Sequence, residues 1–267
     1  MLQQITREGG VAVSYERYGQ GENLVLVHGG FSDHLTNWQR VRDRLGETFT
    51  VSAVARRGRG QTTASTGHGV ADEAADVVAL LEAIGEPSIV LGHSYGGLVA
   101  VEAAARRPGL VRALALYEPA QPTSLDPSLV DKLSGLAARN DWDGVVDAFL
   151  REGVFMPDDD LAALRASDDW APWLADAPAT VNDLRALVAH DLDLTRFRSL
   201  DMPVLLLIGS ESPREVFLTD ALAAILPDVQ IVTLEGQAHE GMTTAPGQFA
   251  DAIEAFAADV SRRRRAA

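Results

Sequence analysis

The segment Leu91–Gly97 constrains the fold of this chain more than any other stretch. It reads Leu-Gly-His-Ser-Tyr-Gly-Gly, with a β-branched apolar run before it and helix-forming residues, 98–105, after it. A strand that turns sharply into a helix, with a serine at the bend between glycines, is a nucleophile elbow. The glycines leave room for the tight turn, and the strained serine backbone holds its hydroxyl clear of the chain. The pattern therefore predicts that Ser94 is a nucleophile.

Strands and helices alternate through most of the sequence. Continuous apolar runs, typical of strands buried on both faces, occur at 24–28, 48–54, 88–91, 110–117, 202–208 and 229–234. An alternating stretch, 10–18, predicts a half-exposed strand. Helical spacing occurs at 33–45, 70–84, 214–226 and 246–265. This order predicts an α/β fold with a mostly parallel sheet and helices on both faces.

Residues that follow the strand ends are expected to share one edge of that sheet, where α/β proteins place their working groups. They are His28, Arg56, Ser94, Glu118, Ser210 and His239.

The stretch 121–200 loses this alternation. It has proline breaks at 157, 172 and 178 and a set of aromatic residues: Trp142, Phe149, Phe155, Trp170, Trp173 and Phe197. The prediction is a helical insertion over 121–200 between two parts of one core domain, 1–120 and 201–267.

A serine hydroxyl needs a base to become a good nucleophile. His93 is the neighbour of Ser94 on a strand and therefore points to the opposite face. His28 precedes two glycines and is expected to bond its loop backbone, and the remaining histidines at 34, 68 and 190 are interpreted as surface or packing residues. His239 stands in a loop bounded by glycines after the last strand. The sequence therefore favours His239 as the general base.

Acyl transfer also needs two hydrogen-bond donors for the oxyanion of the tetrahedral intermediate. The backbone N–H of Tyr95, at the start of the helix after the elbow, is one candidate. The loop after the strand 24–28 offers the N–H groups of Gly30 and Phe31, and Gly30 is taken as the second donor.

Four segments together resemble the α/β-hydrolase fold superfamily. They are His28-Gly29-Gly30, Arg56–Gly60, Gly92–Gly97 and Gly236–His239. The resemblance covers nearly the whole chain apart from the insertion. It implies an eight-stranded sheet, and it implies that 121–200 is a cap over the active site. Serine at the elbow separates this sequence from relatives with aspartate there, such as epoxide hydrolases and haloalkane dehalogenases.

The acid of the triad departs from the family pattern. The family usually has Gly-x-x-Asp after the strand 202–208, whereas this sequence has Ser212 at the aspartate position. Some members take the acid from the end of the preceding strand, and Glu118 is favoured on that ground. Three alternatives stay open: Glu118 pairs with an arginine such as Arg56 or supports the hinge of the cap, Glu211 is the acid, or a Ser–His dyad works without an acid.

A second departure lies in the turn at 55–60. Ala55 replaces an aspartate that family members commonly carry there. Arg56 or Arg57 is interpreted as a surface or structural residue, with binding of a substrate anion as the alternative.

These features predict a serine hydrolase that cleaves a small apolar carboxylic ester, thioester or lactone through an acyl-enzyme at Ser94, with no cofactor and no metal. The alternatives are C–C bond cleavage, lyase or cyclase chemistry in secondary metabolism on the same fold, or ligand binding without turnover.

The composition excludes several classes of binding partner and of catalytic chemistry. The chain has 267 residues, a formal net charge of −15 and no cysteine. The acidic balance argues against nucleic acid and membrane as partners, and the missing thiols exclude disulfides and cysteine catalysis. No uninterrupted apolar stretch is as long as the core of a signal peptide at the N-terminus or as a membrane span elsewhere. A cytoplasmic protein with a small-molecule substrate is therefore expected. A homodimer is compatible with all of this.

Overall fold

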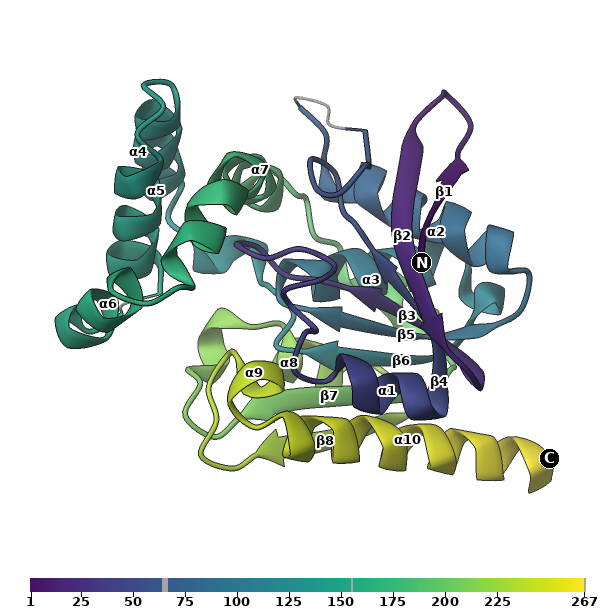
Figure 1. Ribbon diagram of the computed structural model, residues 1–267. Helices are drawn as coiled ribbons and strands as arrows, with labels where there is room; N and C mark the ends of the chain where they lie inside the picture. Colours follow the sequence, from purple (N-terminus) through teal and green to yellow (C-terminus); the bar gives the residue numbers. More distant parts are fainter. Residues whose placement is uncertain (64–66, 155, 267) are drawn as a thin grey trace.

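One eight-stranded sheet runs through the computed structural model, which describes residues 1–63, 67–154 and 156–266 (Figure 1). The strand order is β1-β2-β4-β3-β5-β6-β7-β8. Strand β2 pairs antiparallel with both β1 and β4, and every other neighbouring pair is parallel. The prediction of a mostly parallel sheet is confirmed. The strands are β1 (Leu2–Thr6), β2 (Ala12–Gly19), β3 (Glu22–Val27), β4 (Phe49–Val54), β5 (Ser88–His93), β6 (Val111–Tyr117), β7 (Val204–Gly209) and β8 (Val229–Leu234).

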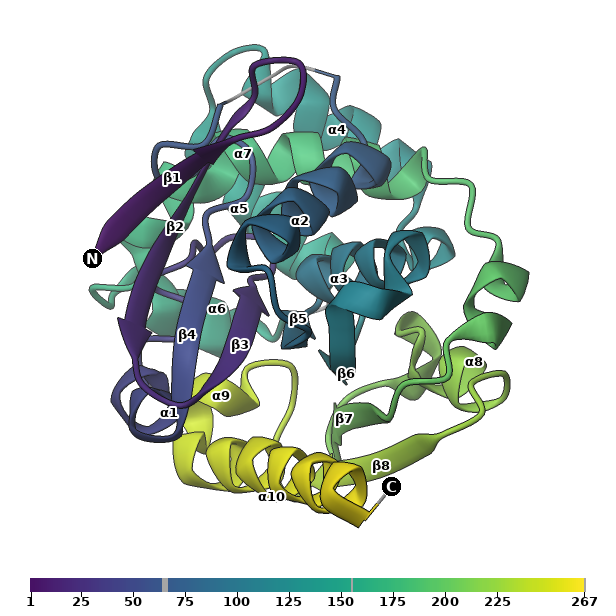
Figure 2. The ribbon, with the colours of Figure 1, turned by 90° about the vertical axis from the view of Figure 1, so that its right-hand side faces the viewer.

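Helices cover both faces of the sheet (Figure 2). Alternate strand residues point to opposite faces, so the buried strands supply two apolar surfaces from one sequence run. Helices α2 (Val70–Ile84), α3 (Tyr95–Arg106) and α8 (Thr219–Ala223) pack on one face, around residues such as Val90 and Leu206. Helices α1 (Arg42–Thr48) and α10 (Pro246–Ala266) pack on the other, around Leu91 and Leu207. The short helix α9 (Gly241–Thr244) precedes α10.

Four α-helices of the described residues between β6 and β7 form a separate layer beyond the carboxyl ends of the central strands (Figure 1). They are α4 (Pro127–Ala137), α5 (Trp142–Ala148), α6 (Asp158–Arg165) and α7 (Trp170–Val188). They enclose their own apolar cluster, and Phe31 from the loop after β3 is part of it. Phe155, one of the aromatic residues noted in the sequence, lies outside the described residues. We call this layer the helical insertion.

Two predicted helices are shorter than the sequence pattern indicates. Residues 34–41 form turns rather than the first half of a helix, and α1 begins only at Arg42. The Asp33 carboxylate accepts from the backbone N–H groups of Leu35 and Thr36, as the sequence-predicted cap would, but no regular helix follows directly. In the stretch 214–226, a short 3₁₀ turn comes before α8. Strand β1 was not predicted, because its sequence has no strong apolar alternation, and it pairs with β2 at the edge of the sheet.

None of the helices in the described ranges has both the length and the apolarity needed to cross a lipid bilayer.

Replacing Phe249 with alanine tests the core beneath the site. Its ring is fully buried and lies 5.6 Å from that of Tyr117, at the end of β6. The cavity should lower the free energy of unfolding by about 3–5 kcal/mol in urea titrations. Leu35→Ala, at a residue 46% exposed, is the control and should change it by less than about 0.5 kcal/mol. Equal effects of the two substitutions would contradict this assignment of the core.

Candidate active site

Ser94 occupies a strained turn between β5 and α3. Its backbone has φ 54° and ψ −123°, a region that non-glycine residues rarely adopt. The turn is held from β6, because Ser94 N–H donates to the Tyr117 carbonyl (3.0 Å) and Ala120 N–H donates to the Ser94 carbonyl (2.9 Å). Gly96 has no room for a side chain, since a Cβ there would lie 2.3 Å from the backbone oxygen of Val27. Close packing of backbones therefore fixes the elbow.

Glu118 and His239 form a hydrogen-bonded pair beside this turn. His239 Nδ1 donates to Glu118 Oε2 at 2.6 Å, and Gly209 N–H donates to Glu118 Oε1 at 2.7 Å. Glu118 is completely buried and also has a left-handed backbone, φ 45°, whereas the His239 side chain is 32% exposed. With Nδ1 bonded to the carboxylate, Nε2 is the ring nitrogen that can accept a proton. Within the described residues, no hydrogen bond joins the Ser94 hydroxyl to His239.

The other acid candidate lies apart from His239. The Glu211 carboxylate accepts from the Ser210 hydroxyl at 2.9 Å and is exposed. Ser212, at the position where the family usually has aspartate, is buried, and its hydroxyl has no hydrogen-bond partner in the part of the chain described. The arrangement thus brings Glu118, and not Glu211, to the base predicted from the sequence.

Side chains around His239 fix its ring and its loop. The ring stacks on Phe217 with centroids 4.9 Å apart and an angle of 15° between the planes. His93 Nε2 donates to the His239 carbonyl at 3.0 Å, and His93 Nδ1 lies 3.1 Å from Asn37 Oδ1. His93 is therefore turned away from the Ser94 hydroxyl, as the sequence predicts, and supports the loop of the proposed base.

The two predicted oxyanion donors are backbone amides without an acceptor among the described residues. They are Gly30, in the loop after β3, and Tyr95, the first residue of α3. The Phe31 amide was also expected to be unbonded, and this was wrong: it donates to Thr180 Oγ1 in α7 at 2.7 Å. The partner lies 149 residues away, so no local pattern could indicate it.

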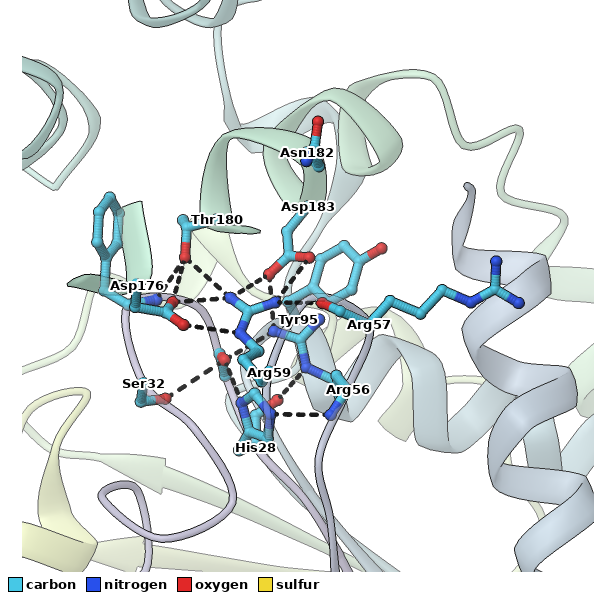
Figure 3. Close-up of polar contacts among 12 residues, drawn as sticks. His28, Ser32, Arg56, Arg57, Arg59, Tyr95, Asp176, Thr180, Asn182 and Asp183 are labelled. Atoms are coloured by element: carbon cyan, nitrogen blue, oxygen red, sulfur yellow. Dashed lines mark hydrogen bonds and ion pairs between the residues drawn. The ribbon is translucent and has the colours of Figure 1, made fainter. Parts of the chain in front are cut away.

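A buried network of charged groups contacts the loop after β3 (Figure 3). Arg56 binds Glu73 of α2 at 3.0 Å and Asp183 of α7 at 2.7 Å, and Arg59 also binds Asp183 at 2.8 Å. Burial opposes the charge of Asp183, but the two guanidinium groups hold the pKa of its carboxyl below the usual value. Arg56 is therefore a structural residue, and it pairs neither with Glu118 nor with solvent.

The same network contains the residues best placed to hold a metal ion. Ligand atoms of His68, Glu73 and Asp183 lie within 4.8 Å of one another. The guanidinium of Arg56 already binds both carboxylates, so a positive charge occupies the position that a cation would need.

Asn37, Thr180 and Asp183 are the site residues that sequence reasoning missed. Asn37 Oδ1 accepts from Gly29 N–H at 3.1 Å, and Thr180 and Asp183 reach the core from a helix of the insertion. The spacing of Asp176, Thr180 and Asp183 places their polar groups on one face of α7. That polar stripe, which faces the core from a largely apolar helix, is the one signal that could have indicated Thr180 and Asp183.

Comparison with known proteins agrees with the fold. The model of the Alpha/beta hydrolase family matches residues 24–252. N-formylmaleamate deformylase from Pseudomonas putida is 31% identical, with 91% of this chain and 94% of that protein aligned. Lipase LipV from Mycobacterium tuberculosis is also 31% identical, over 76% of this chain and 72% of the lipase.

A solved structure has the same architecture. An alpha/beta hydrolase from Sphaerobacter thermophilus superposes with a TM-score of 0.83 and is 30% identical, covering 95% of this chain and 99% of its own. The similarity therefore includes the insertion as well as the sheet.

The buried imidazole of His28 should make stability depend on pH. Its Nε2 accepts from Arg56 N–H and its Nδ1 donates to the Gly29 carbonyl, so the ring is neutral. Burial, and then the charges of Arg56 and Arg59, hold its pKa well below 6.5. The unfolded chain binds this proton first, so the free energy of unfolding should fall as pH drops below about 6.5, by up to about 1.4 kcal/mol per pH unit for this group.

Urea unfolding between about pH 7 and about pH 5 measures this slope, and His28→Gln should reduce it by that amount. NMR of the labelled ring gives a direct check. A His28 ring that titrates near its ordinary pKa of 6.5 would contradict the assignment.

Proposed function

This chain belongs to the alpha/beta hydrolase family, and we propose that it is a serine hydrolase that cleaves carboxylic esters, thioesters or lactones through an acyl-enzyme. Ser94 is the nucleophile, His239 is the general base and Glu118 orients and stabilises the imidazolium. The Gly30 and Tyr95 amides hold the oxyanion. In the first step the Ser94 oxygen bonds the acyl carbon, His239 takes the hydroxyl proton, and that proton then passes to the leaving alcohol, thiol or ring oxygen. Water reverses these steps and releases the acid.

The observation that carries this proposal is the 2.6 Å hydrogen bond between Glu118 and His239 at the sheet edge that also holds the elbow. A buried carboxylate on Nδ1 fixes the tautomer whose Nε2 accepts a proton, which is the arrangement a serine nucleophile needs. Strained, left-handed backbone at Ser94 and Glu118 supports the same assignment, because such strain concentrates at functional sites.

An apolar, uncharged substrate fits the surroundings best. The Phe31 ring lies 4.7 Å from Phe149 and 4.9 Å from Trp173, so aromatic residues of the insertion meet the loop of the proposed oxyanion hole. Phe217 stacks on the base itself. Arg56, whose guanidinium contacts this loop, is bound by carboxylates and is not available to a substrate anion. Esters of small apolar acids are therefore the favoured class.

Hydrolysis of p-nitrophenyl acetate and butyrate, together with labelling by a fluorophosphonate, tests the proposal. The wild-type protein should turn over at least one ester and should be labelled at Ser94, and Ser94→Ala should lose both. Labelling of the wild type without turnover of any ester would contradict ester hydrolysis and favour the non-hydrolytic chemistry that the fold also supports.

Glu118→Gln should lower kcat by about 10⁴-fold with a small effect on KM, because the amide cannot stabilise the imidazolium or hold the required tautomer. Glu211→Gln is the matched control, since it makes the same change at the exposed carboxylate that does not contact His239. A Glu118→Gln enzyme with kcat within a few-fold of wild type would show that the triad assignment is wrong.

A further inference from the structure

We infer that Arg56 and Thr180 are positioning residues that orient the Gly30 amide of the oxyanion hole, an inference that rests on the proposed serine hydrolase mechanism. Neither residue touches the reacting atoms. They act on two successive peptide groups of the loop after β3, one from the core and one from the helical insertion.

The first peptide joins Gly29 to Gly30. Its carbonyl accepts from Arg56 Nη2 at 2.8 Å and from His28 Nδ1 at 2.8 Å, and both donors are buried. In a trans peptide the N–H points opposite to the carbonyl, so the group that anchors the Gly29 oxygen also aims the Gly30 N–H. Gly29 packs directly against the elbow, since a Cβ added to Gly29 would lie 3.2 Å from Ser94 Cβ.

A cationic donor to the Gly29 carbonyl does more than fix the direction of the Gly30 N–H. A hydrogen bond to a charged group is about twice as strong as a neutral one, and successive bonds polarise each other. The Arg56 guanidinium therefore draws electron density toward the Gly29 oxygen and makes the Gly30 N–H a better donor to a developing oxyanion. The same side chain binds the His28 carbonyl through Nε at 2.9 Å, which keeps it in place.

The second peptide joins Gly30 to Phe31. The Phe31 backbone is left-handed, φ 48°, and its N–H donates to Thr180 Oγ1 at 2.7 Å. The Thr180 oxygen also accepts from Arg59 Nη2 at 3.0 Å, and its hydrogen is donated to Asp176 Oδ2 at 2.7 Å. Every hydrogen-bonding position of this hydroxyl is therefore used, and its direction is fixed (Figure 3).

Thr180 thus holds the strained Phe31 peptide so that the amide before it stays unpaired. Without the hydroxyl, the Phe31 N–H would be buried without a partner, and rotation of the peptide toward the site would relieve this at the expense of the Gly30 geometry. Thr180 also packs its Cγ2 atom against Gly30, 3.3 Å from where a Cβ would be. The insertion therefore contributes to the geometry of the oxyanion hole.

Three substitutions at Thr180 test this. Thr180→Val keeps the shape and removes the hydroxyl, Thr180→Ala removes the hydroxyl with less bulk, and Thr180→Ser keeps the hydroxyl. Asp76→Asn is the matched control, because it weakens a buried ion pair with Arg57 on the neighbouring turn without contact to the loop. Each variant is measured for kcat and KM with p-nitrophenyl butyrate, for inhibition by an aryl trifluoromethyl ketone, and for melting temperature.

The ketone reports on the oxyanion hole directly. Ser94 adds to its carbonyl carbon, the hydroxyl proton moves to His239, and the resulting oxyanion needs the Gly30 and Tyr95 amides. Thr180→Val and Thr180→Ala should each lose roughly 10- to 100-fold in kcat, less than the ~10²–10³-fold for loss of a whole donor, with KM within about threefold. Ketone affinity should fall by the same factor, and Thr180→Ser should stay within about threefold of wild type.

A purely structural role gives a different result. If folded Thr180→Val and Thr180→Ala enzymes keep wild-type kcat and ketone affinity and lose only melting temperature, as Asp76→Asn should, the inference is overturned. It is also overturned if Thr180→Ser loses as much as the other two. Failure of the proposed function is recognised separately in the wild-type protein, which would then show no fluorophosphonate label on Ser94 or would be labelled there without hydrolysing any ester.

Discussion

The structure around the site depends on neutralising the buried guanidinium of Arg56. This one side chain bonds the loop after β3, helix α2 and helix α7, through Gly29, Glu73 and Asp183. Burial disfavours its charge, yet the carboxylates of Asp183 and Glu73 raise the pKa of Arg56 above its ordinary value, so it stays charged. Three segments distant in sequence are thereby required to meet at one point.

Such a network adds little to the free energy of unfolding, but it fixes the relative positions of the segments that it joins. Removal of one partner of a buried ion pair costs about 3–5 kcal/mol, because a charge remains without compensation, whereas the pair as a whole adds little over apolar packing. The benefit is that the insertion cannot slide on the core without breaking ion pairs. Asp183 and Thr180 lie on α7, so the position of this helix and the shape of the loop after β3 are set together.

The sequence predicts those parts of the site that local patterns determine. The elbow at Ser94 and the glycine-bounded loop of His239 are short segments whose backbone requirements appear in neighbouring residues. Contacts between distant segments escape such reasoning, as the hydrogen bond from Phe31 to Thr180 shows, because it spans 149 residues. Edge strand β1 has no fully buried residue, so it carries too little apolar signal to be predicted from the sequence.

In the proposed triad, Glu118 takes the place of the family's usual acid and makes hydrogen bonds through both of its carboxylate oxygens. The carboxylate comes from the end of β6, so it must reach past the end of β7 toward the loop after β8. Three features make this reach possible: the extra methylene of glutamate, the left-handed backbone at Glu118, and the Gly209 amide that holds the second oxygen. That amide belongs to the segment that normally carries the aspartate. The segment that usually carries the acid therefore still supplies a hydrogen-bond donor to Glu118, and Ser212 has no carboxylate to compete for His239.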